Sequence, residues 1–173
     1  MALETNTIQE KLIKTFGDKV LNFQMSRDIF SFEATPDAIH EVIRTLKVEE
    51  DLNFHFLTDL CGVHYPENEA SHQFAVVYHL HNWVENVRLR ITTYLSGENP
   101  ELTTITDLFL TANWMERETF DFYGINFIGH PQLKRILNMP EMVSHPMRKE
   151  FPMEDGGRTD KDDRFFGRTA NNG

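Results

Sequence analysis

Cysteine is almost missing from this sequence, and so are the short motifs that mark common cofactor sites. The chain of 173 residues has one cysteine, Cys61, which excludes an internal disulfide framework and cannot supply the thiolates of an iron–sulfur cluster. Such cysteine usage fits a reducing compartment. GxGxxG, GxxxxGK(S/T) and CxxC do not occur. The sequence therefore offers no dinucleotide-binding loop, no P-loop and no CxxC metal or redox site.

Long apolar runs and an excess of basic residues are missing as well. No apolar stretch approaches the ~20 residues of a membrane-spanning helix, and the N-terminal residues MALETNTIQEK lack the basic flank and apolar core of a signal peptide. The net charge of −10 argues against a protein that binds nucleic acid through its phosphates. With 40% hydrophobic and 25% charged residues, the composition is typical of a soluble globular chain.

Charge and proline content change towards the C-terminus. Residues 1–133 hold nine Lys or Arg and 20 Asp or Glu, whereas residues 134–173 hold eight basic and seven acidic residues. Prolines at 140, 146 and 152 argue against long regular elements there. Exposing Phe151, Phe165 and Phe166 would cost about 1.5–3 kcal/mol each, which favours burial on a partner. We expect a globular domain over residues 1–139 and an extended partner-binding arm over residues 140–173.

Hydrophobic periodicity in the first part predicts two helices and a hairpin. Residues 7–16 read as a helix that begins with a capping box, Thr7 to Glu10. Residues 20–25 and 29–34 read as antiparallel strands. A second helix starts at Thr35, whose hydroxyl is expected to cap it. The expected apolar faces are Ile8, Leu12, Ile13 and Phe16; Leu21, Phe23 and Met25; and Ile39, Val42, Ile43 and Leu46.

Three more strands complete the predicted sheet. Phe54, Phe56 and Leu60 are expected on one face of the third strand, followed by strands over residues 74–81 and 87–94 joined by a short turn. The order of elements is helix, two strands, helix, three strands, helix. Most connections are too short for parallel crossovers. The sequence therefore predicts an α+β fold, a mostly antiparallel sheet with helices packed on one face.

A helix that begins near Thr106 is the most informative element. Two lines of residues run along it: an apolar face of Ile105, Leu108, Phe109, Ala112 and Met115, and a stripe of Leu110, Trp114, Arg117 and Asp121. Aromatic and arginine side chains carry much of the energy of protein interfaces, so the stripe suggests a docking helix. In the alternative, Trp114 covers the domain's own core and Arg117 pairs with Glu118 or Asp121.

Candidate chemistry in this sequence is sparse. His79 and His81 share one face of a strand and are the best candidate metal ligands, but Arg88 and Arg90 are expected beside them, where fixed positive charge disfavours a cation. The alternative is a pair of solvated or partner-facing histidines. Cys61 is expected to be a buried structural thiol.

Other titratable residues fit structural roles. Glu116, Glu118 and Asp121 surround an arginine, which favours ion pairing over acid–base catalysis because no histidine or nucleophile is placed with them. His130 and His145 each precede proline, which restricts the backbone to extended conformations, so a fixed corner is expected.

One family shares this pattern. The relevant residues are Glu116-Arg117-Glu118, Asp121, Gly124, Gly129-His130-Pro131, Leu133, Arg135, Ile136, Leu137, His145-Pro146, Arg148-Lys149 and Pro152. They closely resemble the signature of the C-type subunit of respiratory complex I, the NADH-quinone oxidoreductase. The resemblance covers essentially the whole chain.

The resemblance implies a non-catalytic structural subunit of the peripheral arm, in the module that connects the electron chain to quinone. The complex transfers electrons from NADH through FMN and iron–sulfur clusters to quinone and translocates protons. No cofactor and no catalytic residue are implied for this chain, because partner subunits hold FMN and the clusters. The implied partners are the D-type quinone-site subunit and neighbouring iron–sulfur subunits of the hydrophilic arm, on the cytoplasmic face of the bacterial inner membrane.

The same resemblance implies roles for single residues. Glu116, Arg117, Glu118 and Asp121 would fix the helix to the domain or a neighbour, with Trp114 and Gly124 in the same signature. Gly129-His130-Pro131 would turn the chain, and Arg135, His145, Pro146, Arg148 and Lys149 would anchor the arm. Two other identities stay open: the equivalent subunit of a related membrane-bound hydrogenase or dehydrogenase, and an independent metal-binding protein that uses His79 and His81.

Overall fold

A five-stranded sheet of order β1-β2-β5-β4-β3 forms the centre of the molecule, a computed structural model that describes residues 4–151. Neighbouring strands are antiparallel except β2 and β5, which are parallel. The sequence prediction of a mostly antiparallel α+β sheet is confirmed. The strands are β1 (Val20–Ser26), β2 (Ile29–Ala34), β3 (Phe56–His64), β4 (Phe74–Asn82) and β5 (Val87–Leu95).

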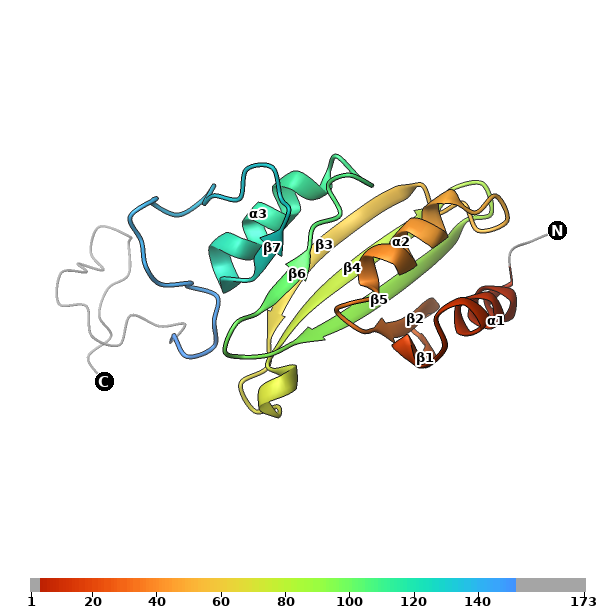
Figure 1. The fold of residues 1–173 in the computed structure, drawn as a ribbon, viewed down its shortest axis with the longest axis horizontal. Coiled ribbons are helices and arrows are strands. Elements are labelled where there is room, and N and C mark those ends of the chain that lie inside the picture. Colours follow the sequence, from red (N-terminus) through yellow and green to blue (C-terminus); the bar gives the residue numbers. More distant parts are fainter. Residues whose placement is uncertain (1–3, 152–173) are drawn as a thin grey trace, which may run out of the picture.

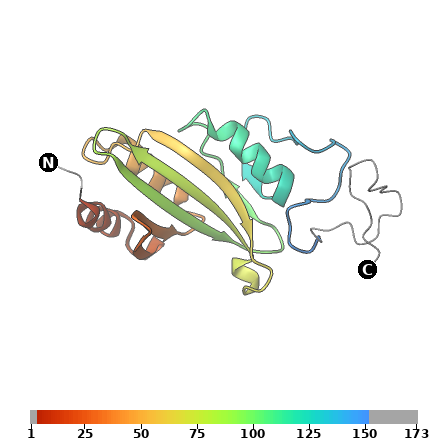
Figure 2. The same ribbon diagram turned by 180° about the vertical axis from the view of Figure 1, so that it is seen from behind.

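Helices cover one face of this sheet. In Figure 1 α2 (Ile39–Val48) lies in front of the long strands, and in Figure 2, seen from behind, the strands lie in front of α2. The other helices, α1 (Thr5–Phe16) and α3 (Ala112–Tyr123), bury residues in the same hydrophobic core. Two short 3-10 turns, η1 (Gly17–Lys19) and η2 (Ala70–His72), join elements. The predicted packing of helices on one face is confirmed.

The core is formed by apolar residues that recur every second position in the strands and every three to four positions in the helices. Alternate residues of β4, from Phe74 to Leu80, are buried and lie opposite alternate residues of β5, with Tyr78 beside Ile91. The predicted stripe of α2 is fully buried on top of them. Each large apolar side chain removed from water contributes about 1.5–3 kcal/mol, so burial of this layer stabilises the fold substantially.

Two N-terminal details of the sequence prediction are wrong. α1 begins before Thr7 and its N-terminus has no side-chain cap, so the expected capping box does not form. Thr35 donates its hydroxyl to Asp37 Oδ1 (2.6 Å), and α2 starts only at Ile39, so the hydroxyl does not cap the helix. The Thr35 hydroxyl binds the nearby Asp37 carboxylate instead of a backbone N–H at the start of the helix.

Irregular pairing overturns two predicted strand faces. Pairing shifts between Leu21 and Gln24 in β1, and Asn22 has a φ of 55°, so Leu21 and Met25 are exposed while Phe23 packs on the core. A similar shift between residues 57 and 59 of β3 exposes Phe56 and buries Leu57 with Leu60. One extra residue reverses the side-chain alternation, which a periodicity argument does not detect.

The last helix starts later than predicted. One strand before it in the sequence pairs with one strand after it to form a small second sheet. Residues 105–111 form hydrogen-bonded turns, and α3 begins at Ala112 rather than near Thr106. The strands β6 (Glu101–Thr103) and β7 (Asn126–Ile128) pair in parallel on either side of α3. Strands of three residues are too short to give a periodic signal, and the sequence did not predict them.

After β7 the chain returns along α3. Residues 129–151 contain no helix or strand and lie beside α3 at the end of the molecule opposite α1 (Figure 1). The domain boundary predicted at residue 139 stays a prediction. Most of the predicted arm, including Pro152, Phe165 and Phe166, lies outside the described residues.

Candidate functional site

The histidines of β4 are already engaged. His79 lies opposite Arg90, and His81 lies opposite Arg88, as the sequence predicted. Arg90 Nε donates a hydrogen bond to His79 Nε2 at 3.0 Å, which occupies that nitrogen and places a positive charge beside the ring. Within residues 4–151 no group of three His, Cys, Asp or Glu side chains is placed to hold a metal ion.

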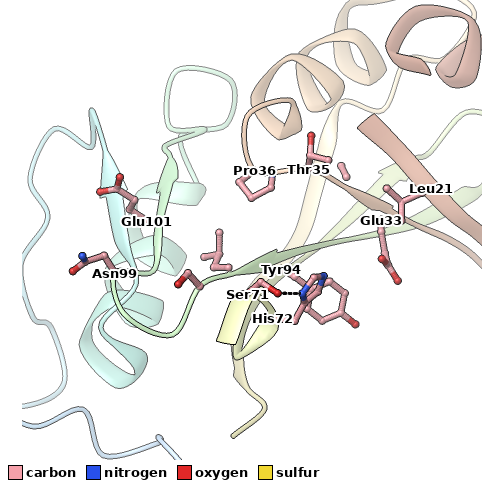
Figure 3. Close-up of a pocket in the computed structure, with 12 residues that line it drawn as sticks. Leu21, Glu33, Thr35, Pro36, Ser71, His72, Tyr94, Asn99 and Glu101 are labelled. Carbon is pink, nitrogen blue, oxygen red and sulfur yellow. Dashed lines mark hydrogen bonds between the residues drawn. The ribbon is translucent and has the colours of Figure 1, made fainter. Parts of the chain in front are cut away.

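The hollow between the ends of β2 and β5 contains a serine–histidine contact but no catalytic arrangement. It has a volume of about 420 Å³. Ser71 Oγ lies 2.7 Å from His72 Nδ1, while Asn99 and Glu101 lie at the other side of the hollow (Figure 3). His72 Nε2 has no hydrogen-bond partner among the described residues, so no third group orients the ring as in a triad.

Cys61 is half-buried at the edge of a smaller hollow between β3 and α3. Burial raises the pKa of its thiol, and the nearby Asp59 carboxylate raises it further. A protonated thiol is a poor nucleophile. Cys61 is thus less buried than the sequence predicted, but its raised pKa fits a structural thiol better than a nucleophile.

Glu116 is a carboxyl group sealed inside the protein. Its side chain is fully buried and accepts hydrogen bonds from the Thr104 hydroxyl (2.5 Å) and the Ile105 N–H (2.8 Å). Desolvation raises its pKa to about 7, against the opposing effect of these donors. Glu116 thus ties the turn before α3 to the helix, and it does not line the hollow near Ser71, the one beside Cys61 or the groove beside Trp114.

Asp121 is the centre of the densest polar network in the described chain. It is fully buried, and its carboxylate forms a salt bridge with Arg135 Nη1 at 2.7 Å. Consecutive backbone N–H groups of Ile136, Leu137 and Asn138 converge on Oδ2 at 3.0, 2.8 and 3.0 Å. Desolvation alone would raise its pKa, but the backbone donors and Arg135 outweigh it and hold the pKa well below the usual range.

Other bonds fasten the same segment. Arg135 Nη2 donates to the Ser144 carbonyl at 2.9 Å, and the Asn138 side chain donates to Asp121 Oδ1 at 3.0 Å. The backbone carbonyl of Asp121 accepts from His145 Nδ1 at 3.0 Å. One aspartate on α3 therefore holds two stretches of the returning chain.

Arg117 and Trp114 differ sharply in exposure. Arg117 is nearly buried and donates to the carbonyls of Lys134 (3.1 Å) and Arg135 (3.4 Å). Its guanidinium lies 4.8 Å from the Trp114 ring centre. Trp114 itself is 63% exposed. The alternative expected from the sequence, with Trp114 on the core and Arg117 paired to a carboxylate, is not what forms.

An exposed groove lies beside Trp114. It has a volume of about 460 Å³, and Leu110, at its edge, is 88% exposed. Pro131 and Gly129 from the corner after β7 also line it. Large exposed apolar side chains around a groove are typical of a protein-binding surface.

His130 fixes that corner. Its Nδ1 accepts the N–H of Gln132 at 3.0 Å, so Nε2 carries the proton and donates to the Asn113 carbonyl at 3.1 Å. Gly129 has a φ of 83°, a conformation that glycine adopts without strain. The Gly-His-Pro corner therefore turns the chain back along α3, within this domain.

The end of α3 is packed too closely for a side chain. Gly124 has a φ of 73° and caps the helix in the left-handed conformation. A Cβ there would lie 2.6 Å from both the Arg148 guanidinium and the His145 ring. Arg148 Nε donates to the Tyr123 carbonyl at 2.8 Å. The absence of a side chain at Gly124 thus leaves room for His145 and Arg148, which donate hydrogen bonds to backbone carbonyls in the last turn of α3.

The remaining signature residues lie at the margins. The Lys149 N–H donates to His64 Nδ1 at 3.0 Å, which joins the segment to β3. Glu118 is exposed on α3, and Pro146 is half-buried beside His145. The structure gathers most sequence-predicted residues around α3, but it uses them within the chain rather than at a catalytic centre. Sequence reasoning missed Thr104, Asn138 and His64, whose partners lie 12, 17 and 85 positions away.

No helix among the described residues is long and apolar enough to cross a membrane.

Comparison with known proteins identifies the family. Residues 32–156 match the family model "Respiratory-chain NADH dehydrogenase, 30 Kd subunit". The chain is 43% identical over 143 residues to the second C-type subunit of the NADH-quinone oxidoreductase of Rhizobium meliloti, covering 82% of this chain and 76% of the relative. It is 38% identical over 168 residues to the C-type subunit of the NADH-quinone oxidoreductase of Roseiflexus castenholzii, covering 96% and 95%.

Solved structures agree with this result. The trypsin-resistant fragment (1-134) of Nqo5 has a TM-score of 0.61 and 28% identity, covering 73% of this chain and 99% of the fragment. A chain of the archaeal membrane-bound sulfane sulfur reductase has a TM-score of 0.72, 24% identity and coverage of 86% and 85%, which shows a shared fold. The chain belongs to the family of C-type subunits of the respiratory-chain NADH dehydrogenase, the NADH-quinone oxidoreductase.

Proposed function

We propose that this chain is a non-catalytic structural subunit of the peripheral arm of NADH:quinone oxidoreductase, in the module that connects the electron chain to quinone. The observation that carries the proposal is the Asp121 network. If the signature residues were catalytic, their side chains would be expected to point into a cavity that could hold a substrate. Here three signature groups instead bind residues 134–149 to α3. They are the Asp121 carboxylate, the Arg135 guanidinium and the His145 ring.

This arrangement makes a rigid base for a partner. Asp121, Arg117 and Arg148 all bind backbone atoms of the segment or the helix, so the segment's path does not depend on side-chain packing alone. Rigid surfaces lose less entropy on association and therefore bind more tightly. Beside this base, Leu110 and Trp114 stay exposed in a groove, where a partner side chain would bury them.

Redox cofactors would then belong to other subunits. The single cysteine is half-buried and protonated, and no group of ligands within residues 4–151 is arranged for a metal. The proposed partners are the D-type quinone-site subunit and neighbouring iron–sulfur subunits, on the cytoplasmic face of the bacterial inner membrane. In the complex, electrons pass from NADH through FMN and the clusters to quinone, and this chain holds the geometry of its neighbours.

The test is purification of the tagged chain from membranes extracted with mild detergent. Mass spectrometry identifies the co-purifying subunits, and an NADH:quinone assay measures activity. We expect iron–sulfur, D-type and membrane subunits with NADH-dependent activity, and no iron or flavin in the chain purified alone. Recovery of hydrogenase or sulfur reductase subunits would mean that this chain has the same structural role in a related membrane complex instead. A chain that stays alone in the soluble fraction would overturn the proposal.

A further inference from the structure

The face of the sheet opposite the helices is not covered by any described element. Figure 2 shows β3, β4 and β5 in front of α2, with nothing of residues 4–151 lying over the middle of these strands. Val63, Val77 and Thr92 on this face are half-buried. Sheets usually bury both faces or leave a polar face to water. This face is mixed, partly apolar and partly charged.

Among residues 4–151, the two arginines on this face form no salt bridge. Arg88 has no hydrogen bond or ion pair among residues 4–151, and Arg90 uses only Nε, in its bond to His79. Elsewhere the cations Lys11, Lys19 and Arg44 each pair with carboxylates of the same chain. Residues 1–133 hold 20 acidic residues and nine basic ones, and among them Arg88 and Arg90 lie side by side without a carboxylate partner in the described chain.

Geometry places the two groups as a pair. Residues two apart on a strand project from the same face about 7 Å apart. His79 lies between Arg90 and Asp59, whose Oδ2 is 3.9 Å from His79 Nδ1. Burial lowers the pKa of His79, and Arg90 lowers it further, so the ring stays neutral and orients the guanidinium. Arg90 is therefore held with its two terminal nitrogens free to bind an anion.

Exposed aromatic residues stand at the same end of the sheet. Trp83, in the β4–β5 turn, is 60% exposed and lies 5.0 Å from the ring of Phe56, which the shift in β3 turns outward. The neighbouring Val84 is 77% exposed. Tryptophan and arginine are among the residues most enriched in the positions that dominate binding energy.

We propose that Arg88, Arg90, Trp83 and Phe56 form a second docking surface, which binds an acidic amphipathic helix of a partner subunit. Carboxylates of the helix would pair with the two guanidinium groups, and an apolar residue would cover Trp83. A helix fits because β4 and β5 are interior strands, so no strand can pair with them and their open face needs a layer. The proposal rests on the proposed function, since it needs an assembled complex, but it concerns the face away from α3.

The experiment places the photo-crosslinker p-benzoylphenylalanine at position 83 in the tagged chain and irradiates the purified complex. The matched control carries it at Val48, which is 63% exposed at the end of α2. We expect position 83 to cross-link to an acidic helix of one partner subunit. Replacing Arg88→Glu and Arg90→Glu together is expected to lower that cross-link yield about tenfold, because like charges replace opposite ones. The charge-matched control Lys14→Glu with Arg27→Glu should keep it.

Each other outcome overturns the inference. Cross-links only within the chain, to a second copy of it, to lipid or to a partner segment without acidic residues would all exclude the acidic-helix surface. Equal yields in the Arg88 and Arg90 variant and its control would do the same. A complex that purifies intact without cross-links from position 83 refutes this surface and leaves the proposed function standing. A chain that recovers no partner subunits refutes the proposed function instead.

Discussion

Glu116 and Asp121 show how the same chemical group behaves oppositely at two positions on one helix. Both carboxyls are fully buried. Glu116 receives two neutral donors, which do not offset desolvation, so its pKa rises to about 7. Asp121 receives three backbone donors, an amide and a guanidinium, and its pKa falls. The donors around Asp121 outnumber those around Glu116, and they outweigh desolvation only at Asp121.

Stability should therefore depend on pH through Glu116. Between pH 4.5 and about 7 the folded protein holds a proton that the unfolded chain has released, so stability falls as pH rises through this window and levels off above it. The size is roughly 3 kcal/mol, from 1.36 kcal/mol per pKa unit. We predict that Glu116→Gln removes this fall, measured as the difference from wild type in urea unfolding between pH 5 and 8. Glu118→Gln, an exposed control on the same helix, should keep it, and identical profiles for wild type and Glu116→Gln would contradict the assignment.

Asp121→Asn is predicted to be the more damaging change. It leaves Arg135 unpaired and turns an amide NH₂ towards backbone donors, which costs about 3–5 kcal/mol for a broken buried ion pair. Trypsin should then cut the isolated subunit faster after Lys134 and Arg135. The control Asp107→Asn disrupts an exposed contact with His40 and should cost less than about 1 kcal/mol. If both variants melt alike, the Asp121 network does not hold the segment.

Acid should act on Asp121 in the opposite sense to Glu116. Because its folded pKa lies below the unfolded value, its contribution is fully present above about pH 4 and is lost only as pH falls further. Residues 134–149 should therefore stay protected from hydrogen exchange at pH 5.

At the scale of elements, α3 and the segment beside it behave as one unit. The helix supplies carbonyls and Asp121, and the segment supplies Arg135, His145 and Arg148 to bind them. The last turn of a helix leaves carbonyls unsatisfied, and here the returning chain satisfies three of them, those of Asp121, Phe122 and Tyr123. Loss of the segment's anchor should therefore fray the end of α3.

Gly124→Ala tests this coupling. The left-handed φ costs any other residue about 1–2 kcal/mol, and the Cβ also collides with Arg148 and His145. Gly129→Ala has the same kind of φ, and its nearest neighbour is 3.5 Å away, so it carries the strain without the collision. We predict a larger loss of stability for Gly124→Ala and faster hydrogen exchange at residues 145–149 in that variant alone. Equal exchange in both variants would mean that the segment tolerates displacement from α3.

At the scale of the whole molecule, the exposed groove on α3 separates folding from assembly. Leu110 and Trp114 contribute little to the core because they are mostly in water. The double change Leu110→Ala and Trp114→Ala should alter the free energy of unfolding of the isolated subunit by less than about 1 kcal/mol, mainly the contact between Trp114 and Arg117.

Assembly should respond much more strongly. Buried aromatic anchors are typically worth about 2 kcal/mol or more at an interface, so recovery of partner subunits with the tagged variant should fall more than tenfold. Met25→Ala, at an exposed apolar residue of β1, is the control and should leave recovery unchanged. Full recovery with the double variant would remove this groove from the interface.

The class of fold and the family could be predicted from the sequence. Alternation in β4 and β5 and the stripe of α2 are local signals, and each is set by residues a few positions apart. The signature from Glu116 to Lys149 was likewise readable, because its identity lies in residue types and spacing. What periodicity did not reveal were the shifts in β1 and β3, since one extra residue reverses a strand's faces without leaving a local mark.

The contacts of the signature residues, by contrast, follow from the way distant elements pack together. Asp121 meets Asn138, Glu116 meets Thr104, and Lys149 meets His64 only when separate elements are brought together. The same fold determines that Arg117 is buried while Trp114, one turn away, is exposed. Whether a polar residue serves its own chain or a partner depends on which donors and acceptors surround it, and those come from distant parts of the sequence.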